Sequence, residues 1–489
     1  MRDGAVSEVI GAFVLVSIAV LAMTILVLVL YTNPLPTKVP SFSGLVSNRS
    51  TTIYISNEGG DPLLWGQYKI LVDNVDETWN FTKSLPDPNR TFSLGKVMNA
   101  TLPKMSSRVV MVFNTSWGGG TVLLSADLMK QTVLSGWYNP TWLYRKKITI
   151  DHTKVPSDQN SFPVLISLSD VDISAKAQHS GNDILFTSSD GVTKLSHEIE
   201  SYTWNSGALV AWVKVPTLSS GTDTILYMYY ANPAAGNQQD PTNVWDANYM
   251  AVWHLDEAGT GSATDYSDST INANYGEGGG GNSWLPNQTP GKIASGQSFT
   301  PNDYIQGPNT PSLTVSSQLT MEAWVNLANA NNNQKIVGKT STTPGVNTGY
   351  GYILGVQTNG LYPEFWDSAQ TGPFTFTSGA VPNTLWTYIA VTWTTGGNII
   401  GYVNGAQVNS IPASGNGIGT LTNGLRIGVA PYHVSADQYF VTGLIDEVRI
   451  SNTARPGSWI QTEYNNENNP GVGGFLLSVS TEQTSASMS

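Results

Sequence analysis

The chain has 489 residues, more than one hydrophobic core usually serves, so we expect about three domains. Charged residues make up only 12%, against about 25% in an average soluble protein, and 23 basic against 35 acidic residues give a net charge of −12, which argues against nucleic acid as a partner. Because cysteine is absent, disulfides, thiolate metal centres and cysteine catalysis are excluded.

An apolar run without a charged residue extends from residue 10 to residue 31. As a helix it would be about 33 Å long, at about 1.5 Å per residue, which is enough to cross the core of a bilayer. We therefore predict one N-terminal transmembrane helix within residues 1–34, a protein of the cell membrane or cell surface, and extracellular domains after the helix. A cleaved secretory peptide is the alternative, but no small-x-small cleavage site follows the run.

A charged leader that ends in Gly4 precedes the run, and Glu8 is an acidic residue at its start. This pattern resembles the class III signal sequence of archaeal type IV pilin-like proteins. The resemblance implies cleavage between Gly4 and Ala5 and retention of the helix. Glu8 would be the fourth mature residue, whereas bacterial pilins normally have a glutamate as the fifth, so a role in assembly and a bare charge at the membrane edge both stay open.

Prolines at positions 34, 36 and 40 end the helix and favour an extended spacer. Short apolar stretches at 52–55, 68–73, 109–113 and 121–125 then alternate with turn residues, so residues 35–134 are predicted to form a small β-sandwich. The turn at 57–62 resembles the membrane-proximal domain of archaeal pilin-like proteins. Five sequons here predict a glycoprotein, with chance occurrence as the alternative: Asn48, Asn80, Asn89, Asn99 and Asn114.

Residues 135–244 carry further predicted strands at 162–168, 184–187, 209–215 and 225–230. Together with the sequence His-Glu-Ile-Glu at 197–200, they resemble an uncharacterised β domain that precedes lectin-like domains in prokaryotic surface proteins. Glu198 and Glu200 share one face of a strand, and paired carboxylates carry out glycosidase chemistry. We favour the alternative that they form a solvated or locally structural pair. Asp190 and Gly191 predict a hairpin turn.

Residues 245–475 contain an ordered series of motifs at strand-like spacing, namely 253–257, 268–276, 319–325, 386–393, 401–405 and 443–450. The series resembles the laminin-G/concanavalin A-like jelly roll. Within it, strand alternation places residues 321, 323 and 325 on one face and residues 320, 322 and 324 on the other, and Asn404-Gly405 predicts a tight hairpin. The fold class is thus mainly β, a transmembrane helix followed by β-sandwich domains, and we expect residues 476–489 to be a flexible tail.

The loop at 265–276 is rich in hard oxygen donors, which suit calcium. By resemblance to the family, Asp268, Asn272 and Asp446 are the expected calcium ligands. The alternatives are that Asp268 and Asn272 only cap turns and that Asp446 pairs with Arg449 or another basic residue. The five histidines show no metal-ligand spacing, so a histidine-built zinc or iron centre is not expected from the spacing.

The related glucanases carry a Glu-x-Asp-x-x-Glu strand, which is absent here. Tyr362 and Trp366 lie in an aromatic, acidic stretch that could stack on a sugar ring, with a plain strand and turn as the alternative. We expect a membrane-anchored adhesion or recognition protein that binds an extracellular glycan or surface protein, and not an enzyme. A filament subunit that self-assembles is the main alternative, and a carbohydrate hydrolase is a weaker one.

Overall fold

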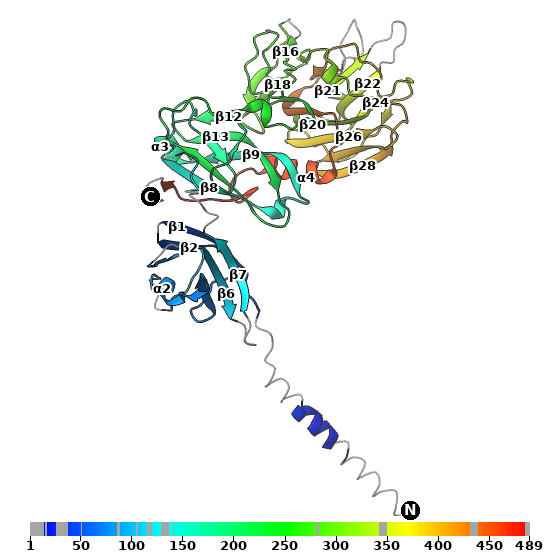
Figure 1. The fold of residues 1–489 in the computed structure, drawn as a ribbon. Coiled ribbons are helices and arrows are strands. Elements are labelled where there is room, and N and C mark those ends of the chain that lie inside the picture. The colour runs from blue at the N-terminus through cyan, green and yellow to red at the C-terminus, as the bar shows by residue number, and fades with distance from the viewer. Residues whose placement is uncertain are drawn as a thin grey trace, which may run out of the picture. The chain divides into compact units, whose positions relative to one another are not determined.

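The structure is a computed structural model that describes residues 14, 17–25, 38–49, 51–85, 89–103, 106–114, 120–128, 136–139, 141–279, 283–341, 350–430 and 439–484. The chain divides into two compact units, residues 1–135 and residues 136–488 (Figure 1). The prediction of a mainly-β chain is confirmed, and the strands predicted in both units coincide with observed ones.

Residues 17–25 are helical and exposed. Within the part of the chain that the structure describes, no helix is both long and apolar enough to cross a membrane. The predicted helix at 10–31 lies partly outside the described residues, and Gly4, Ala5 and Glu8 lie wholly outside them.

The first unit is a sandwich of two small antiparallel sheets and a short helix, α2 (Thr78–Thr82). One sheet has the order β1 (Phe42–Arg49), β2 (Thr52–Gly60), β5 (Val97–Thr101). The other has the order β4 (Val75–Asp76), β3 (Tyr68–Val72), β6 (Arg108–Asn114), β7 (Gly120–Asp127). Alternate residues of the inner strands, such as Ile53 and Ile55 on β2, are buried and form the core.

The second unit has two lobes. The small lobe contains a three-stranded sheet with the order β12 (His197–Thr203), β13 (Ala208–Leu218), β9 (Gln159–Ser169). Its six-stranded sheet has the order β11 (Lys194–Leu195), β10 (Leu185–Thr187), β14 (Thr224–Tyr230), β8 (Tyr144–Ile150), β31 (Leu476–Val479), with β32 (Gln483–Thr484) also on β8. Short helices connect the strands: η1 (His152–Lys154), α3 (Val171–Lys176) and η2 (Pro241–Asn243). The predicted turn at Asp190 and Gly191 lies in the β10–β11 hairpin.

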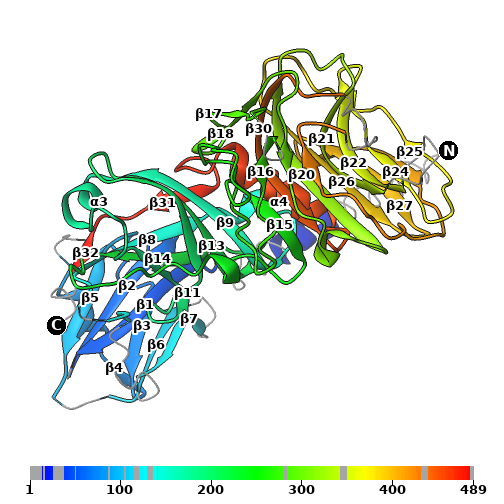
Figure 2. The ribbon, with the colours of Figure 1, turned by 90° about the horizontal axis from the view of Figure 1, so that it is seen from above.

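Residues 476–484 correct one of our expectations. We expected a flexible tail from residue 476, but β31 and β32 pair with β8 of the small lobe (Figure 2). Leu476 is fully buried, and Lys176 Nζ lies 2.6 Å from Glu482 Oε1. The small lobe is therefore completed by a segment more than 300 residues away in sequence from its first strand, and the large lobe is an insertion within it.

The large lobe is a sandwich of two eight-stranded antiparallel sheets, and α4 (Gly457–Asn468) follows it. The first sheet has the order β17 (Asn287–Pro290), β18 (Ser295–Phe299), β30 (Gly443–Ser451), β20 (Gln318–Leu327), β26 (Thr387–Thr394), β27 (Asn398–Val403), β28 (Ala406–Pro412), with β15 (Tyr249–Trp253) on β30. The second has the order β16 (Glu277–Gly278), β19 (Ile305–Gln306), β29 (Arg426–Ile427), β21 (Gln334–Ser341), β22 (Tyr350–Gln357), β24 (Glu364–Trp366), β25 (Phe374–Thr375), with β23 (Gly360–Leu361) on β22. The short helix η4 (Pro311–Leu313) precedes β20.

Strand alternation on β20 is confirmed. Met321, Ala323 and Val325 lie in the core between the two sheets, whereas Trp324 lies in a second core on the outer face of the first sheet. That second core also contains Trp459 of α4 and residues of the small lobe, so the two lobes share buried apolar surface. The predicted hairpin is confirmed too, because Asn404 and Gly405 have φ values of 50° and 76° between β27 and β28.

Candidate functional site

The aromatic segment predicted to contact a ligand lies on β24 and beside it. Phe365 packs in the core, so Glu364 and Trp366 face outward from the second sheet. Trp366 is only 6% exposed, whereas Tyr362 is half-buried. Asp367 accepts hydrogen bonds from Thr371 N (2.8 Å) and Thr371 Oγ1 (2.6 Å), which is the turn that we considered as the alternative. Tyr362 is thus the more accessible of the two predicted aromatic residues.

A buried ion pair lies next to Tyr362. Lys335 Nζ lies 2.7 Å from Glu364 Oε2, and the two side chains are 0% and 8% exposed. The same ammonium lies 4.3 Å from the ring centre of Tyr362 and 5.5 Å from that of Tyr439. Burial lowers the pKa of Lys335 and raises the pKa of Glu364. We call Lys335, Tyr362, Glu364 and Tyr439 the outer-face patch. It combines a cation, a carboxylate and aromatic rings, which can orient a polar ligand.

Asp268 and Asn272, two of the predicted calcium ligands, lie in the loop after β15. The Asp268 carboxylate accepts hydrogen bonds from Val252 N (3.0 Å), Thr270 N (2.9 Å), Thr270 Oγ1 (2.9 Å) and Asn274 N (2.7 Å). Asn272 Nδ2 donates to a backbone carbonyl of β15 at 3.1 Å. Burial raises the pKa of Asp268. These contacts correspond to the turn-capping alternative.

Asp446, the third predicted ligand, is fully buried on β30. Its Oδ2 accepts hydrogen bonds from two backbone N–H groups at 292–293, at 2.7 and 2.9 Å. Arg449 pairs with glutamates and not with Asp446. Among the described residues, Asp446 shares no hydrogen-bond partner with Asp268 or Asn272. Calcium at these three residues stays a prediction.

Glu198 and Glu200, the carboxylate pair noted in the sequence, lie in a buried charged cluster between the two lobes of the second unit. They come from β12 of the small lobe, and the other members come from β30, from α4 and from the residue that follows β15. We call this set the interlobe cluster: Glu198, Glu200, His254, Glu447, Arg449, Glu463 and Glu467. None of these side chains is more than 13% exposed.

His254 lies at the centre of one half of the cluster. Its Nδ1 lies 2.8 Å from Glu447 Oε1 and 3.6 Å from Glu200 Oε2, and its Nε2 lies 3.4 Å from Glu198 Oε2. Trp212 stacks on the imidazole with 5.7 Å between ring centroids, and its Nε1 donates to Glu200 Oε2 at 2.8 Å. The imidazole is thus held between three carboxylates.

Arg449 organises the other half of the cluster. Its guanidinium donates to Glu447 Oε2 at 2.6 Å and to Glu467 Oε1, and it lies 3.9 Å from Glu463 Oε1. The same guanidinium lies 4.7 Å from the ring centre of Trp212. Glu447 therefore bridges the two cationic side chains, because one of its oxygens contacts His254 and the other contacts Arg449.

Two of the glutamates lie at β-bulges. In β12, Ile199 pairs with Ala211 and Ser201 pairs with Val210, which leaves Glu200 as the extra residue. In β30, the register against β20 shifts between residues 446 and 449, and Glu447 has a φ of 52°. A bulge redirects side chains, and a left-handed backbone costs a residue other than glycine roughly 1–2 kcal/mol. The two bulges direct these carboxylates toward the cluster, and at Glu447 this requires a left-handed backbone.

Five carboxylates stand against two cationic side chains in the interlobe cluster. Burial and the charge of Glu447 hold the pKa of Glu200 well above its usual value. Burial alone would lower the pKa of His254, but Glu447 and Glu198 outweigh it and raise that pKa well above its usual value. Burial raises the pKa of Glu467 to about 7, although Arg449 opposes the shift. Carboxyl groups outnumber cationic side chains here, and burial and mutual repulsion favour the neutral form of Glu200 and Glu467.

The cluster is not arranged for glycoside hydrolysis, because Glu200 is fully buried and Glu198 accepts hydrogen bonds from Trp245 (3.2 Å) and Ser269 (2.6 Å). A sugar would need open access to both carboxylates. Our sequence reasoning noted the pair but missed its partners His254, Glu447 and Arg449. The sequence did hold one indication of these partners, because His254 lies in the jelly-roll motif at 253–257 and Glu447 and Arg449 lie in the motif at 443–450.

The five sequons all lie in the first unit. Asn89 and Asn99 are exposed. The amide nitrogen of Asn80 donates to Glu77 Oε2 at 2.5 Å, and that of Asn114 donates to Gly66 O at 3.0 Å. Asn48 lies on β1. Glycosylation at these positions stays a prediction, and Asn89 and Asn99 are the most accessible acceptors among the four described by their side chains.

The first unit also carries an exposed aromatic pair that our sequence reasoning missed. Trp65 and Trp79 are 54% and 56% exposed, with 6.4 Å between their ring centroids. The Arg90 guanidinium lies 4.2 Å from the ring centre of Trp79 and 5.0 Å from that of Trp65. Large exposed aromatic rings of this kind often contact partners.

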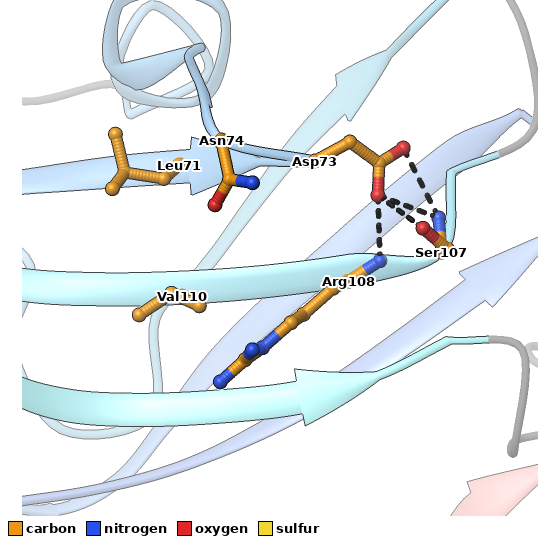
Figure 3. Close-up of a pocket in the computed structure, with 6 residues that line it drawn as sticks. All are labelled: Leu71, Asp73, Asn74, Ser107, Arg108 and Val110. Carbon is orange, nitrogen blue, oxygen red and sulfur yellow. Dashed lines mark hydrogen bonds between the residues drawn. The ribbon is translucent and has the colours of Figure 1, made fainter.

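A hollow in the first unit is shown in Figure 3 and is lined by Leu71, Asp73, Asn74, Ser107, Arg108 and Val110. Asp73 and Asn74 have positive φ values and form the two-residue turn between β3 and β4. The Asp73 carboxylate accepts hydrogen bonds from Ser107 Oγ (2.5 Å) and Arg108 N (2.9 Å). It fastens this turn to the start of β6, which is a structural role.

Two family models match parts of the chain. Residues 299–461 match the concanavalin A-like lectin/glucanases superfamily, and residues 180–268 match a domain of unknown function, DUF2341. The chain therefore contains a concanavalin A-like domain and a DUF2341 domain. The interlobe cluster draws residues from both matched segments. No curated protein matches the chain.

Several solved structures show a partial likeness. The binding domain of Paraclostridial Mosquitocidal Protein 1 is 14% identical over 45% of this chain and 52% of its own, with a TM-score of 0.34, so the chain spans about half of that protein. Domain 4 of AbnA, a GH43 extracellular arabinanase from Geobacillus stearothermophilus in complex with arabinotriose, is 18% identical over 45% and 99%, with a TM-score of 0.35. The CBM40 of Ruminococcus gnavus IT-sialidase, bound to α2,3-sialyllactose, is 13% identical over 31% and 85%, with a TM-score of 0.29. Likeness at these scores carries no functional argument.

Proposed function

We propose that this chain is a cell-surface recognition protein in which the large lobe binds a carbohydrate or the surface of another protein. The observation that carries the proposal is the outer-face patch on a concanavalin A-like sandwich. There the buried pair Lys335 and Glu364 lies beside the ring of Tyr362, and Tyr439 is 42% exposed. The buried pair would fix the position of the Tyr362 ring at the surface of the lobe, where the ring can contact a ligand.

The proposed mechanism is binding without catalysis. Sugar rings present apolar C–H faces and polar hydroxyls, so an aromatic ring beside hydrogen-bonding groups suits both. Tyr362 and Tyr439 would contact the ligand, and the buried pair of Lys335 and Glu364 would hold the ring of Tyr362 in place. Binding at one such patch is weak, and display of many copies on a surface would raise the avidity.

We further propose that residues 10–31 hold the protein at the cell surface, as a membrane anchor with the later domains outside the cell. The exposed apolar side chains of the helix at 17–25 support this, since Leu21 and Met23 are 62% and 68% exposed. Such a helix is stable in lipid or against other helices. The resemblance at Gly4, Ala5 and Glu8 to a class III leader agrees with either environment.

The alternative is a pilin-type filament in which this helix packs in the core. Electron microscopy of sheared cell-surface material, labelled for this chain, separates the two. Labelled filaments would favour the filament subunit, whereas label confined to membrane fragments would favour the anchor.

Replacement of Tyr362 by alanine tests the binding proposal. On a glycan array and in titrations with the best array ligand, we expect Tyr362→Ala to weaken binding by at least about fivefold, because a ring in contact with a ligand contributes more than about 1 kcal/mol. Tyr275→Ala is the matched control, since Tyr275 is 40% exposed in the same lobe but lies outside the patch. Equal affinity of both variants and the unchanged protein would remove the patch from the binding site.

A further inference from the structure

We propose that Glu200, His254 and Glu447 form a binding site for a divalent first-row transition metal ion, with zinc as its representative. One ligand atom from each of the three residues lies within 4.8 Å of the others. A zinc ion with ligands at about 2.0–2.2 Å places neighbouring ligand atoms roughly 3–3.5 Å apart. The distances from His254 Nδ1 to the two carboxylates are 2.8 and 3.6 Å, one just below and one just above this spacing, so shifts of a few tenths of an ångström would accommodate the ion.

An unsatisfied oxygen marks the site independently of its charge. Glu200 Oε1 is buried and accepts no hydrogen bond, while Oε2 of the same carboxylate accepts one from Trp212. A buried carboxylate oxygen without a partner is costly, and native structures rarely keep one. The oxygen near His254 Nδ1 is Oε2, at 3.6 Å, so a cation would satisfy Oε1 when both oxygens of the Glu200 carboxylate contact it.

The surrounding residues orient the three ligands as the outer shell of a metal site does. Glu198 Oε2 lies 3.4 Å from His254 Nε2 and can keep the proton on that nitrogen. Nδ1, which lies 2.8 Å from Glu447 Oε1, would give up its proton to solvent when the ion binds. Trp212 fixes Glu200, and Arg449 fixes the second oxygen of Glu447 at 2.6 Å. Each ligand is thus held from behind by another side chain.

The backbone around the ligands is irregular at all three positions. Glu200 and Glu447 lie at bulges, and Leu255, directly after His254, has a φ of 63°. Such strain is kept where the surrounding structure requires a particular side-chain direction. The three irregularities converge on one point where the two lobes meet.

The ligand types favour a transition metal over calcium. An imidazole nitrogen with two carboxylates suits zinc or manganese, whereas calcium prefers oxygen ligands alone. The ion would bridge β12 of the small lobe and β30 of the large lobe, so it would fasten the two lobes together.

Zinc titration of the full chain in detergent tests the proposal. After treatment with a chelator and buffer exchange, we expect the protein to bind one tightly held zinc ion. Glu200→Gln and His254→Gln should each weaken that binding by at least about tenfold, the lower bound for disturbing a metal site. Calcium added in place of zinc should not compete.

Two variants provide matched controls. Among the described residues, Asp151, His152 and Asp223 form a second group that could hold a metal ion. Asp223→Asn alters that group only, so this variant should bind zinc as tightly as the unchanged protein. Glu463→Gln removes a carboxylate of the same cluster that is not a proposed ligand. The Glu463 carboxylate accepts a hydrogen bond from Tyr249 at 2.7 Å, so this variant can have a lower melting temperature, but it should still bind zinc tightly.

X-ray absorption at the zinc edge keeps the test decisive if a ligand variant fails to fold. The unchanged protein should show nitrogen and oxygen ligands at about 2.0–2.1 Å that include an imidazole. The proposal is overturned if the folded, unchanged protein retains no zinc, if its zinc shell lacks imidazole, or if Glu200→Gln binds zinc as tightly as the unchanged protein.

Discussion

Replacement of Arg449 by methionine is expected to lower the free energy of unfolding of the second unit by about 3–5 kcal/mol, the usual cost of removing one partner from a buried ion pair. Arg449 is 1% exposed, and its guanidinium contacts Glu447, Glu467 and Glu463. Methionine keeps much of the apolar stem but leaves these carboxylates without their cation. Denaturant titration followed by tryptophan fluorescence measures the change.

The loss should depend on pH. The pKa of Glu467 is raised to about 7 in the folded protein, so this carboxyl group stabilises the fold while it is protonated and loses that contribution as the pH rises from about 4.5 through 7. Without Arg449 the carboxyl becomes still harder to ionise, so the variant should be destabilised less at pH 5 than at pH 8. Lys194→Ala removes an exposed cation from the same unit and should change stability by less than about 0.5 kcal/mol. If the variant were as stable as the unchanged protein at both pH values, Arg449 would not be needed to neutralise the carboxylates of the interlobe cluster.

Replacement of Leu476 by alanine should destabilise the second unit by about 2–5 kcal/mol, because it opens a cavity in a packed core. Leu476 is fully buried on β31 in the core shared by the two lobes. The adjacent Leu477 is 51% exposed on the opposite face of the same strand, so Leu477→Ala is a matched control with an expected change below about 0.5 kcal/mol.

Thermal unfolding followed by circular dichroism compares the two variants. If residues 476–484 were a flexible tail, both leucines would be equally tolerant of alanine. A large difference between neighbouring leucines is expected only if β31 completes the sheet on β8.

The parts of the fold that were predicted correctly depend on local rules. The alternation of Met321, Ala323 and Val325 follows from the two-residue period of a strand, and the hairpin at Asn404 follows from its tolerance of a positive φ. The strand at 476–479 could not be predicted in the same way. It is four residues long, and its partner β8 lies more than 300 residues away in sequence, so nothing local distinguishes it from a tail.

The candidate sites show a similar limit. Glu198 and Glu200 were noticed because they are two residues apart, but Glu447 lies 193 residues from His254, and no spacing rule connects them. The bulge at Glu447 is also invisible in the sequence, because glycine is the residue expected at a positive φ. For Asp268 the prediction of a polar loop was sound, yet the same oxygen atoms that suit calcium also suit backbone N–H groups, and the sequence does not distinguish these roles.

The return of β31 to β8 has a mechanical consequence for a protein that holds on to a ligand. If the large lobe binds a ligand as proposed, a pull on that ligand would reach β31 through residue 475, while the first unit would hold the small lobe at residue 136. Because Leu476 pairs with Ile150 and β31 runs antiparallel to β8, these two forces slide the strands past each other along their length. Hydrogen bonds that lie across the strands then resist together, whereas they would break one after another if the strands were peeled apart. The β8–β31 pair is thus loaded in shear, the direction in which an antiparallel pair withstands tension best.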